Sequence, residues 1–210
     1  MNPHQVTRDF EAALCEYTGA PYAVAVNSCT MALLLACAFK RFHLGSETVE
    51  IPKLTYVSVP QSIIHAGHRV SFRDEDWLGS YELKPLNIWD SARWFSGGMY
   101  GEHQVFSGTP NPMVCVSFHA SKTLGIEQGG AILHNDFIAD EWLRRARFDG
   151  RSEGVAPKND VFDMLGWHCY INPSTAAQGL LRMHSLPAYN EELKNDEYSD
   201  LSGMEIFKNG

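Results

Sequence analysis

One lysine of this chain stands where a charged amine is costly to keep. Lys122 lies between two apolar runs, in the segment VCVSFHASKTLGIEQGGAIL (residues 114–133). An ammonium group that is buried without a partner costs much free energy. A lysine desolvated beside buried strands loses proton affinity and becomes a nucleophilic amine that can form a Schiff base. A lysine on an exposed turn, with its amine in water, is the alternative.

Two further segments place polar or charged groups where a strand ends. In VAVNSCTMAL a strand runs directly into a helix, and Ser28, Cys29 and Thr30 occupy the junction. The free N–H groups of a first helical turn bind anions, so the junction is a candidate phosphate site or otherwise a plain helix cap. In LNIWDSA, Asp90 ends an apolar strand. A buried aspartate must be hydrogen-bonded, paired or placed against a ligand cation, although an ordinary turn aspartate also fits.

A fourth segment adds an aromatic residue, because Tyr56 follows a strand that ends at Pro52. Together the four segments supply what pyridoxal 5′-phosphate requires. It needs an anion site for its phosphate, an aromatic side chain over its ring, a carboxylate for its pyridine nitrogen and a lysine for its aldehyde. Each segment alone has a structural explanation, and their combination predicts this cofactor. The sequence has no glycine-rich phosphate loop that would favour a mononucleotide or dinucleotide instead.

Strands that alternate with helices must bring these residues together. Apolar periodicity and turn residues predict this order: helix 7–18, strand 22–28, helix 29–44, strand 47–52, helix 55–67, strands 68–75, 86–92, 112–119 and 129–136, and helices 136–150 and 172–186. Several strands are apolar throughout, which is typical of a sheet covered by helices on both faces. We therefore expect an α/β fold, a three-layer α/β/α sandwich with a mostly parallel sheet over residues 1–150. Residues 151–210 are expected to form a loop, one helix and a short acidic tail.

Composition and charge narrow the class of protein. The chain has 210 residues, is 44% hydrophobic and carries a net charge of −8, which disfavours nucleic acid as a partner. No apolar run is as long as a membrane span, and the polar, then amphipathic N-terminus is unlike a signal peptide. The five cysteines form no Cys-x-x-Cys pair, so we expect neither disulfides nor a metal site. By exclusion we expect a cytoplasmic protein with no membrane partner.

Five segments carry a resemblance to a known family. In chain order they are FEAALCEYTGAPYAVAVNSCTMALLLA, IPKLTYVSVPQSIIHAGHRVSFRD, WDSA, CVSFHASKTLGIEQGGAILHND and GWHCYINPSTAAQGLL. They resemble the DegT/DnrJ family of pyridoxal-phosphate-dependent sugar aminotransferases, which have the aspartate aminotransferase fold (fold type I). The resemblance covers most of residues 9–182. It implies conversion of keto-sugar nucleotides to amino sugars, an amino donor that is usually glutamate, and a homodimer with shared active sites.

The same resemblance implies cofactor-binding roles for individual residues. Asn172 matches an asparagine that reaches the phosphate of the cofactor in the partner subunit, so its helix is expected at the dimer site. Within one subunit, the resemblance implies that Ser28, Cys29, Thr30 and Ser117 bind the cofactor phosphate. It further implies that Tyr56 stacks on the ring, Asp90 contacts the pyridine nitrogen and Lys122 forms the Schiff base.

Two departures from the family pattern shape the functional expectation. Arg93 stands where the family has a glutamine, and near the cofactor its cation would alter the ring electronics or bind an acidic substrate. The interval between Tyr56 and Asp90 is about half of the usual one, which predicts that a strand–helix unit is missing. The sequence ends soon after the Asn172 helix, which predicts an absent or reduced C-terminal small domain. Shortened members encoded in phage and metagenomic sequences are similar in this respect.

These observations favour one function over two alternatives. We expect an aminotransferase that acts on a keto-sugar nucleotide or a similar keto sugar, with Lys122 and Asp90 as its catalytic residues. One alternative is a degenerate, non-catalytic relative that binds pyridoxal phosphate or a sugar nucleotide. The other is a general α/β scaffold with an unrelated ligand.

Overall fold

Helices and strands alternate along most of the chain, as the periodicity predicts. The structure, a computed structural model, describes residues 4–101, 106, 108–194 and 198–208. Its main elements are α1 (Gln5–Thr18), β1 (Tyr22–Val26), α2 (Cys29–Leu44), β2 (Thr48–Pro52), α3 (Ser58–His65), β3 (Arg69–Arg73), β4 (Tyr81–Leu83), β5 (Ile88–Ser91), β6 (Met113–Ser117), β7 (Gly130–His134), α4 (Phe137–Ala146) and α5 (Pro173–Met183). Every helix and strand expected from the sequence is present, and β4 is an additional strand.

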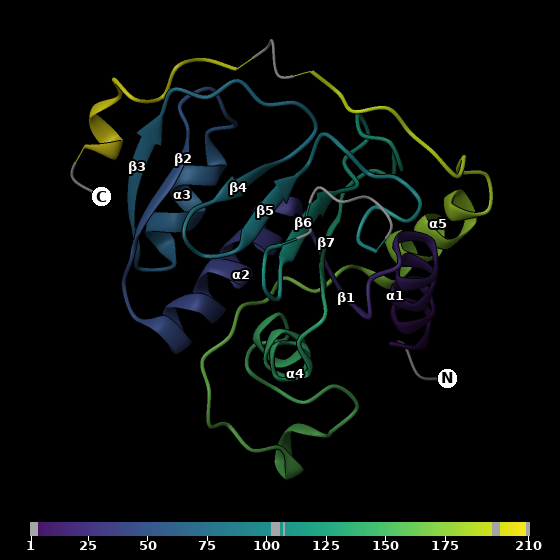
Figure 1. Ribbon diagram of the computed structural model, residues 1–210. Helices are drawn as coiled ribbons and strands as arrows, with labels where there is room; N and C mark the ends of the chain where they lie inside the picture. The colour runs from purple at the N-terminus through teal and green to yellow at the C-terminus, as the bar shows by residue number, and fades with distance from the viewer. Residues whose placement is uncertain (1–3, 102–105, 107, 195–197, 209–210) are drawn as a thin grey trace.

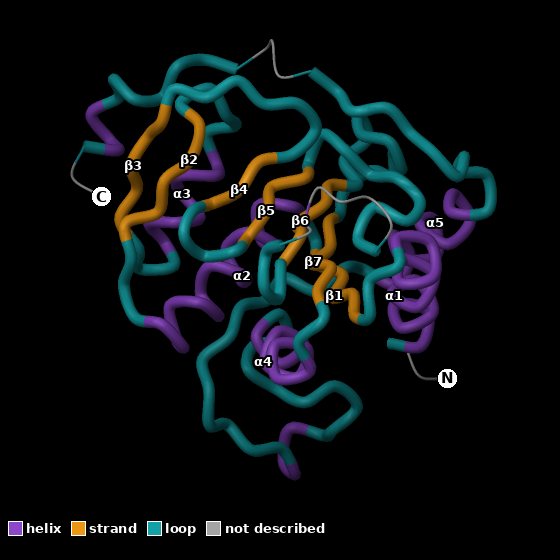
Figure 2. Tube along the Cα trace, viewed as in Figure 1, coloured by secondary structure: helices purple, strands orange, loops and turns teal. Residues whose placement is uncertain are grey.

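The strands form a five-stranded mixed sheet and a two-stranded parallel sheet, which lie side by side through the middle of the molecule (Figures 1 and 2). Five strands pair in the order β1-β7-β6-β5-β4, and β2 pairs with β3 in parallel. Backbone hydrogen bonds of 2.8 and 3.1 Å between Glu50 of β2 and Lys84, which directly follows β4, join the two sheets in antiparallel orientation. It follows from these pairings that β1, β2, β3, β5 and β6 run in one direction and that β4 and β7 run against them.

The two reversed strands have a common physical cause. A parallel pair needs a long crossover connection, usually a helix, whereas an antiparallel pair can be closed by a short one. A tight turn at residues 84–87 joins β4 to β5, and the helix-free loop 118–129 joins β6 to β7. The expected α/β fold is confirmed, and its sheet is less uniformly parallel than expected because these two connections contain no helix.

Helices cover both faces of the sheet, which gives the expected three layers. Side chains that alternate along the strands enter two separate apolar clusters. Val24 and Ile132 belong to the cluster under α2, α3 and α4, whereas Ala23 and Leu133 belong to the cluster under α1 and α5. Most of α2 is buried, which explains its long apolar run. Burial on both faces fixes the strand positions from which the site residues project.

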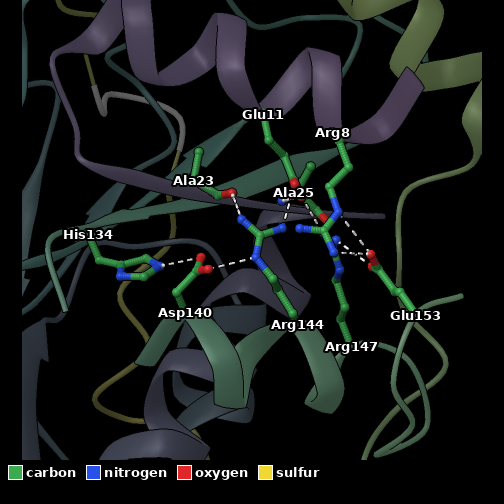
Figure 3. A network of polar contacts seen from close by, with 9 residues as sticks. All are labelled: Arg8, Glu11, Ala23, Ala25, His134, Asp140, Arg144, Arg147 and Glu153. Carbon is green, nitrogen blue, oxygen red and sulfur yellow. Dashed lines mark hydrogen bonds and ion pairs between the residues drawn. The ribbon is translucent and has the colours of Figure 1, made fainter. Parts of the chain in front are cut away.

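A buried ion network ties α4 to α1 and β1 (Figure 3). Arg144 of α4 and Arg147, which directly follows α4, both point at Glu11 of α1, and the Arg144 pair measures 2.6 Å. Glu11 also accepts the backbone N–H of Ala25 at 2.9 Å. Arg147, fully buried, donates to Glu153 at 2.7 Å, which holds the start of the loop after α4. The network therefore fixes β1, whose end leads into α2.

The C-terminal part of the chain returns to the sheet. α5 packs against α1, and the following tail crosses from α5 to the vicinity of β3 (Figure 1). Leu201 N–H donates to the carbonyl of Lys53 at 3.0 Å, and Phe207 contacts Phe72 edge-on at 5.9 Å between ring centroids. Residues 195–197 and 209–210 of the expected acidic tail lie outside the described residues. The described tail is packed along the edge where β2 and β5 end.

Among the described residues no helix combines the length and apolar character that crossing a membrane requires.

Candidate active site

A cavity of about 360 Å³ opens at the edge of the sheet where β1, β5 and β6 end. Residues that are far apart in the sequence line it. Those expected to bind the cofactor within one subunit all lie in this lining: Ser28, Cys29, Thr30, Tyr56, Asp90, Arg93, Ser117 and Lys122. The structure thus brings the candidate site residues of one chain to a single cavity, while their individual roles stay predictions.

The first turn of α2 forms one wall of the cavity. The Ser28 hydroxyl accepts the Met31 N–H at 3.2 Å and caps the helix. The N–H groups of Cys29 and Thr30 have no carbonyl acceptor within the helix, because the first turn of a helix lacks the preceding residues that would supply one. The Thr30 hydroxyl lies 2.8 Å from that of Ser58 at the start of α3. The junction is therefore both a helix cap and a place where an anion can bind.

A glycine lets the sheet approach this turn closely. A Cβ atom on Gly130 of β7 would lie 2.6 Å from the Cys29 nitrogen, 2.7 Å from the Ser28 carbonyl carbon and 2.8 Å from the Val116 oxygen. All three are backbone atoms, which cannot move aside as a flexible side chain can. Only glycine fits here without displacing the first turn of α2.

Asp90 is buried at the end of β5 and has two donors. It is 5% exposed, its Oδ1 accepts the Ala92 N–H at 2.9 Å, and its Oδ2 accepts the Tyr81 hydroxyl at 2.8 Å. Burial raises the pKa of this carboxyl, while the two hydrogen bonds and the nearby Lys122 act in the opposite direction. A carboxylate with donors on two sides and remaining lone pairs toward a cavity can hold a protonated ring nitrogen.

Lys122 lies on the closed loop between β6 and β7. The loop is pinned at its base, since Phe118 N–H donates to the Gly129 carbonyl at 2.9 Å and Ile126 N–H to the Phe118 carbonyl at 3.1 Å. Its tip turns back where Lys122 N–H donates to the His119 carbonyl at 2.8 Å. The lysine is half-buried and faces the cavity that Asp90 also lines. This position differs from that of an exposed turn lysine.

Aromatic residues and one arginine line the rest of the cavity. Tyr56 is 56% exposed and lies 6.3 Å from Tyr198 of the tail between ring centroids. Trp77 stacks on Tyr198 at 6.0 Å with an interplanar angle of 17°. The Arg93 guanidinium lies 5.6 Å from the centre of the same tyrosine ring and its Nε donates to the Leu193 carbonyl at 3.4 Å. The tail therefore reaches the candidate active site.

Several residues of the site are not predicted by the sequence. Trp77 and Tyr198 line the cavity, and Tyr81 lies behind Asp90. Tyr81 belongs to a strand of three residues, which is too short for an alternating pattern to be recognised. Tyr198 lies in an acidic segment with weak periodicity. No local signal identifies either residue.

Asn172 occupies a different place. It caps α5, where its Oδ1 accepts the Ser174 N–H at 2.9 Å and the Ser174 hydroxyl at 2.8 Å. The side chain is exposed and is not among the residues that line the cavity. Its expected contact with a cofactor in a partner subunit stays a prediction.

The chemistry of the cavity fits pyridoxal phosphate. The buried Asp90 carboxylate, the half-buried Lys122 amine and the first turn of α2 are the three polar groups that this cofactor requires. In the part of the chain that the structure describes, no group of three or more histidine, cysteine, aspartate or glutamate residues is arranged to hold a metal ion.

Comparisons with known proteins agree with this assignment. The DegT/DnrJ/EryC1/StrS aminotransferase family matches residues 2–91 and 88–198. A UDP-4-amino-4,6-dideoxy-N-acetyl-β-L-altrosamine transaminase of Campylobacter jejuni is 24% identical over 96% of this chain and 62% of its own. The spore coat polysaccharide biosynthesis protein SpsC of Bacillus subtilis is 44% identical over 69 residues, which are 33% of this chain and 18% of that protein.

Solved structures show the same fold. The aminotransferase TlmJ of Streptoalloteichus hindustanus superimposes with a TM-score of 0.69 at 21% identity, over 87% of this chain and 58% of that one. PseC of Helicobacter pylori, an aminotransferase involved in the biosynthesis of pseudaminic acid, gives a TM-score of 0.65 at 18% sequence identity, over 85% of this chain and 57% of that one. The chain thus spans less than two thirds of the length of these relatives.

The matched residues extend over nearly the whole chain and include every candidate site residue described above. The fold is that of the large domain of fold type I enzymes, and the cofactor of the family is pyridoxal 5′-phosphate. The chain is a member of the DegT/DnrJ/EryC1/StrS aminotransferase family.

Proposed function

We propose that this chain is a pyridoxal-phosphate-dependent aminotransferase that acts on a keto-sugar nucleotide or a similar keto sugar. The observation that carries the proposal is the convergence of a buried carboxylate, Asp90, and an amine, Lys122, on one cavity beside the first turn of α2. Membership of the family and the activities of similar proteins, a nucleotide-sugar transaminase and a GDP-perosamine synthase, support the reaction class. A cytoplasmic homodimer with shared active sites, to which Asn172 contributes, is part of the same proposal.

The first turn of α2 would hold the cofactor phosphate. Ser28, Cys29 and Thr30 line the cavity, where the N–H groups of Cys29 and Thr30 and the hydroxyls of Ser28 and Thr30 would bind the anion, and the positive end of the α2 dipole would add to the attraction. Ser117 at the end of β6 offers a further hydroxyl. Tyr56 would cover one face of the ring and exclude water from it.

Asp90 would keep the ring nitrogen protonated. When bound, the cofactor serves as an electron sink that stabilises the carbanion formed at the donor or acceptor carbon. Asp90 favours this by pairing with the positive nitrogen, and its burial strengthens the pairing because the local dielectric is low.

Lys122 would have two tasks. Its Nζ would hold the cofactor aldehyde between turnovers, and during the reaction the same Nζ would move a proton as general base. Arg93 lines the cavity, and its guanidinium lies over the Tyr198 ring. It would bind an acidic group of the amino donor or the acceptor.

Binding and turnover are tested in sequence with the purified chain. We expect the wild-type protein to bind pyridoxal phosphate with the visible absorbance band of a lysine-bound cofactor, and Lys122→Ala to lose that band while keeping its fold. Adding glutamate should convert the bound cofactor of the wild type to its amine form. Absence of the band from wild-type protein saturated with pyridoxal phosphate would refute the proposal.

A second candidate function is cofactor binding without turnover. It is favoured by the tail, because Tyr198 and the Leu193 carbonyl contact Arg93 at the cavity and would compete with a substrate for it. The glutamate experiment separates the two candidates. A wild-type protein that shows the band but no conversion with glutamate, alanine or glutamine would support this second function.

A further inference from the structure

A chain of hydroxyl groups lies behind the carboxylate of the site. Tyr81 of β4 donates its hydroxyl hydrogen to Asp90 Oδ2 at 2.8 Å, and the Thr55 hydroxyl lies within hydrogen-bond distance of the Tyr81 oxygen. All three side chains are buried, with 2% of Thr55, 3% of Tyr81 and 5% of Asp90 exposed. Thr55 and Asp90 line the cavity, whereas Tyr81 does not. Tyr81 therefore acts on the cavity only through its neighbours.

The direction of the hydrogen bonds follows from the number of hydrogens. A tyrosine hydroxyl has one hydrogen, and an ionised carboxylate can only accept, so the Tyr81 hydrogen points to Asp90. Thr55 must then donate to the Tyr81 oxygen. Donors in a row polarise one another, so the Thr55 hydroxyl strengthens the hydrogen bond from Tyr81 to Asp90.

These hydrogen bonds stabilise the ionised form of Asp90, which burial disfavours. Burial favours the neutral form of the carboxyl, and hydrogen bonds to the charged form counteract it. The Ala92 N–H occupies Oδ1 at 2.9 Å and Tyr81 occupies Oδ2, so the plane of the carboxylate is fixed from two sides. The lone pairs that remain can face the cavity.

The hydrogen bonds from Thr55 through Tyr81 to Asp90 also connect two parts of the site. Thr55 directly precedes Tyr56, the residue expected over the cofactor ring, and the Trp77 Nε1–H holds the Leu54 carbonyl of the same segment at 2.8 Å. β4 lies between β2, which leads into this segment, and β5, which carries Asp90. The additional strand thereby places a hydroxyl between the carboxylate and the loop of the aromatic residue.

We propose that Tyr81 is a positioning residue that, with Thr55, orients Asp90 and keeps it ionised toward the pyridine nitrogen of the cofactor. The inference rests on the proposed binding of pyridoxal phosphate and goes beyond it, because Tyr81 touches neither cofactor nor substrate. Its effect must therefore depend on the presence of a ring nitrogen in the ligand.

The test compares two ligands that differ at that nitrogen. Dissociation constants of pyridoxal 5′-phosphate and of 1-deazapyridoxal 5′-phosphate, in which a C–H replaces the ring nitrogen, are measured for wild type and Tyr81→Phe. Loss of a hydrogen bond to a charged group should weaken binding of pyridoxal phosphate about tenfold or more. Binding of the deaza compound should change by less than about twofold, since it makes no ionic pair with Asp90.

Two further variants complete the experiment. Tyr100→Phe removes a tyrosine hydroxyl that donates to the Pro112 carbonyl at 3.0 Å outside the cavity, and it should leave both constants unchanged. Thr55→Val should weaken binding of pyridoxal phosphate, but not of the deaza compound, by a smaller factor than Tyr81→Phe does. It replaces Tyr81→Phe in the experiment if that variant does not fold. Equal weakening of both ligands, or no weakening of either, would overturn the inference. Failure of wild type to bind pyridoxal phosphate would instead refute the proposed function.

Discussion

The network around Glu11 gives a prediction whose size follows from the structure. Glu11→Gln keeps the shape of the side chain and removes its charge, while its partners Arg144 and Arg147 stay in place. Arg147 is fully buried and Glu11 is 3% exposed, so water cannot replace the lost attraction. Removing one partner of a buried ion pair costs about 3–5 kcal/mol.

The remaining partners reduce this cost. Arg144 still pairs with Asp140 at 2.7 Å, and Arg147 with Glu153 at 2.7 Å, so neither guanidinium is left without a carboxylate. We therefore expect the lower end of the range, a loss of about 3 kcal/mol in the free energy of unfolding. Chemical denaturation of wild type and variant at pH 7, monitored by tryptophan fluorescence, measures the difference.

A matched control makes the same chemical change on the surface. Glu205 pairs with Lys208, and the side chains of the pair are 81% and 49% exposed. Glu205→Gln should change the free energy of unfolding by less than about 0.5 kcal/mol. A loss of less than about 1 kcal/mol in Glu11→Gln, or a loss no larger than that in Glu205→Gln, would refute a stabilising role of the buried network.

Two other perturbations test the site and the pH response. Gly130→Ala introduces a methyl group 2.6–2.8 Å from three backbone atoms around the first turn of α2, so we expect a loss of about 1–3 kcal/mol in the free energy of unfolding and weaker binding of pyridoxal phosphate. Gly203→Ala, where nothing lies within 4 Å of the added methyl group, should show neither effect. Wild-type affinity for pyridoxal phosphate in Gly130→Ala would contradict this account of the phosphate site. Burial lowers the pKa of His134 from 6.5 to about 4, so between these pH values the unfolded chain binds a proton that the folded chain does not. As the pH decreases from 6.5 to about 4, this group should lower the free energy of unfolding by about 3 kcal/mol. A series of denaturation curves of His134→Phe, which keeps a ring beside Tyr22, should lack this loss. Parallel pH profiles of wild type and variant would show that His134 is protonated in the folded state as well.

Much of the fold was predictable because its signals are local. α2 is recognisable from the apolar run MALLLACAF (residues 31–39) between Ser28 and Gly45, and Ser28 does cap the helix. Strands that are buried on both faces show as short apolar runs, and the chemically unusual residues stand where those runs end. Lys122 and Asp90 could be singled out for this reason, since a charge next to a buried strand requires an explanation.

The direction of the strands was less predictable. Whether neighbouring strands run parallel depends on the length and content of the connections between them. The connection between β4 and β5 could not be interpreted, because β4 has only three residues and was not recognised.

The sequence by itself determined the helices and every strand except β4, together with the cofactor class and the residues that line the cavity from strand ends. Only the tertiary structure decided what surrounds them: Tyr81 behind Asp90, and Tyr198 of the tail against Trp77 and Arg93. These contacts join segments that are distant in the chain and have no repeating pattern. Their positions are set by burial and hydrogen bonding within the folded sheet, which no local run of residues encodes.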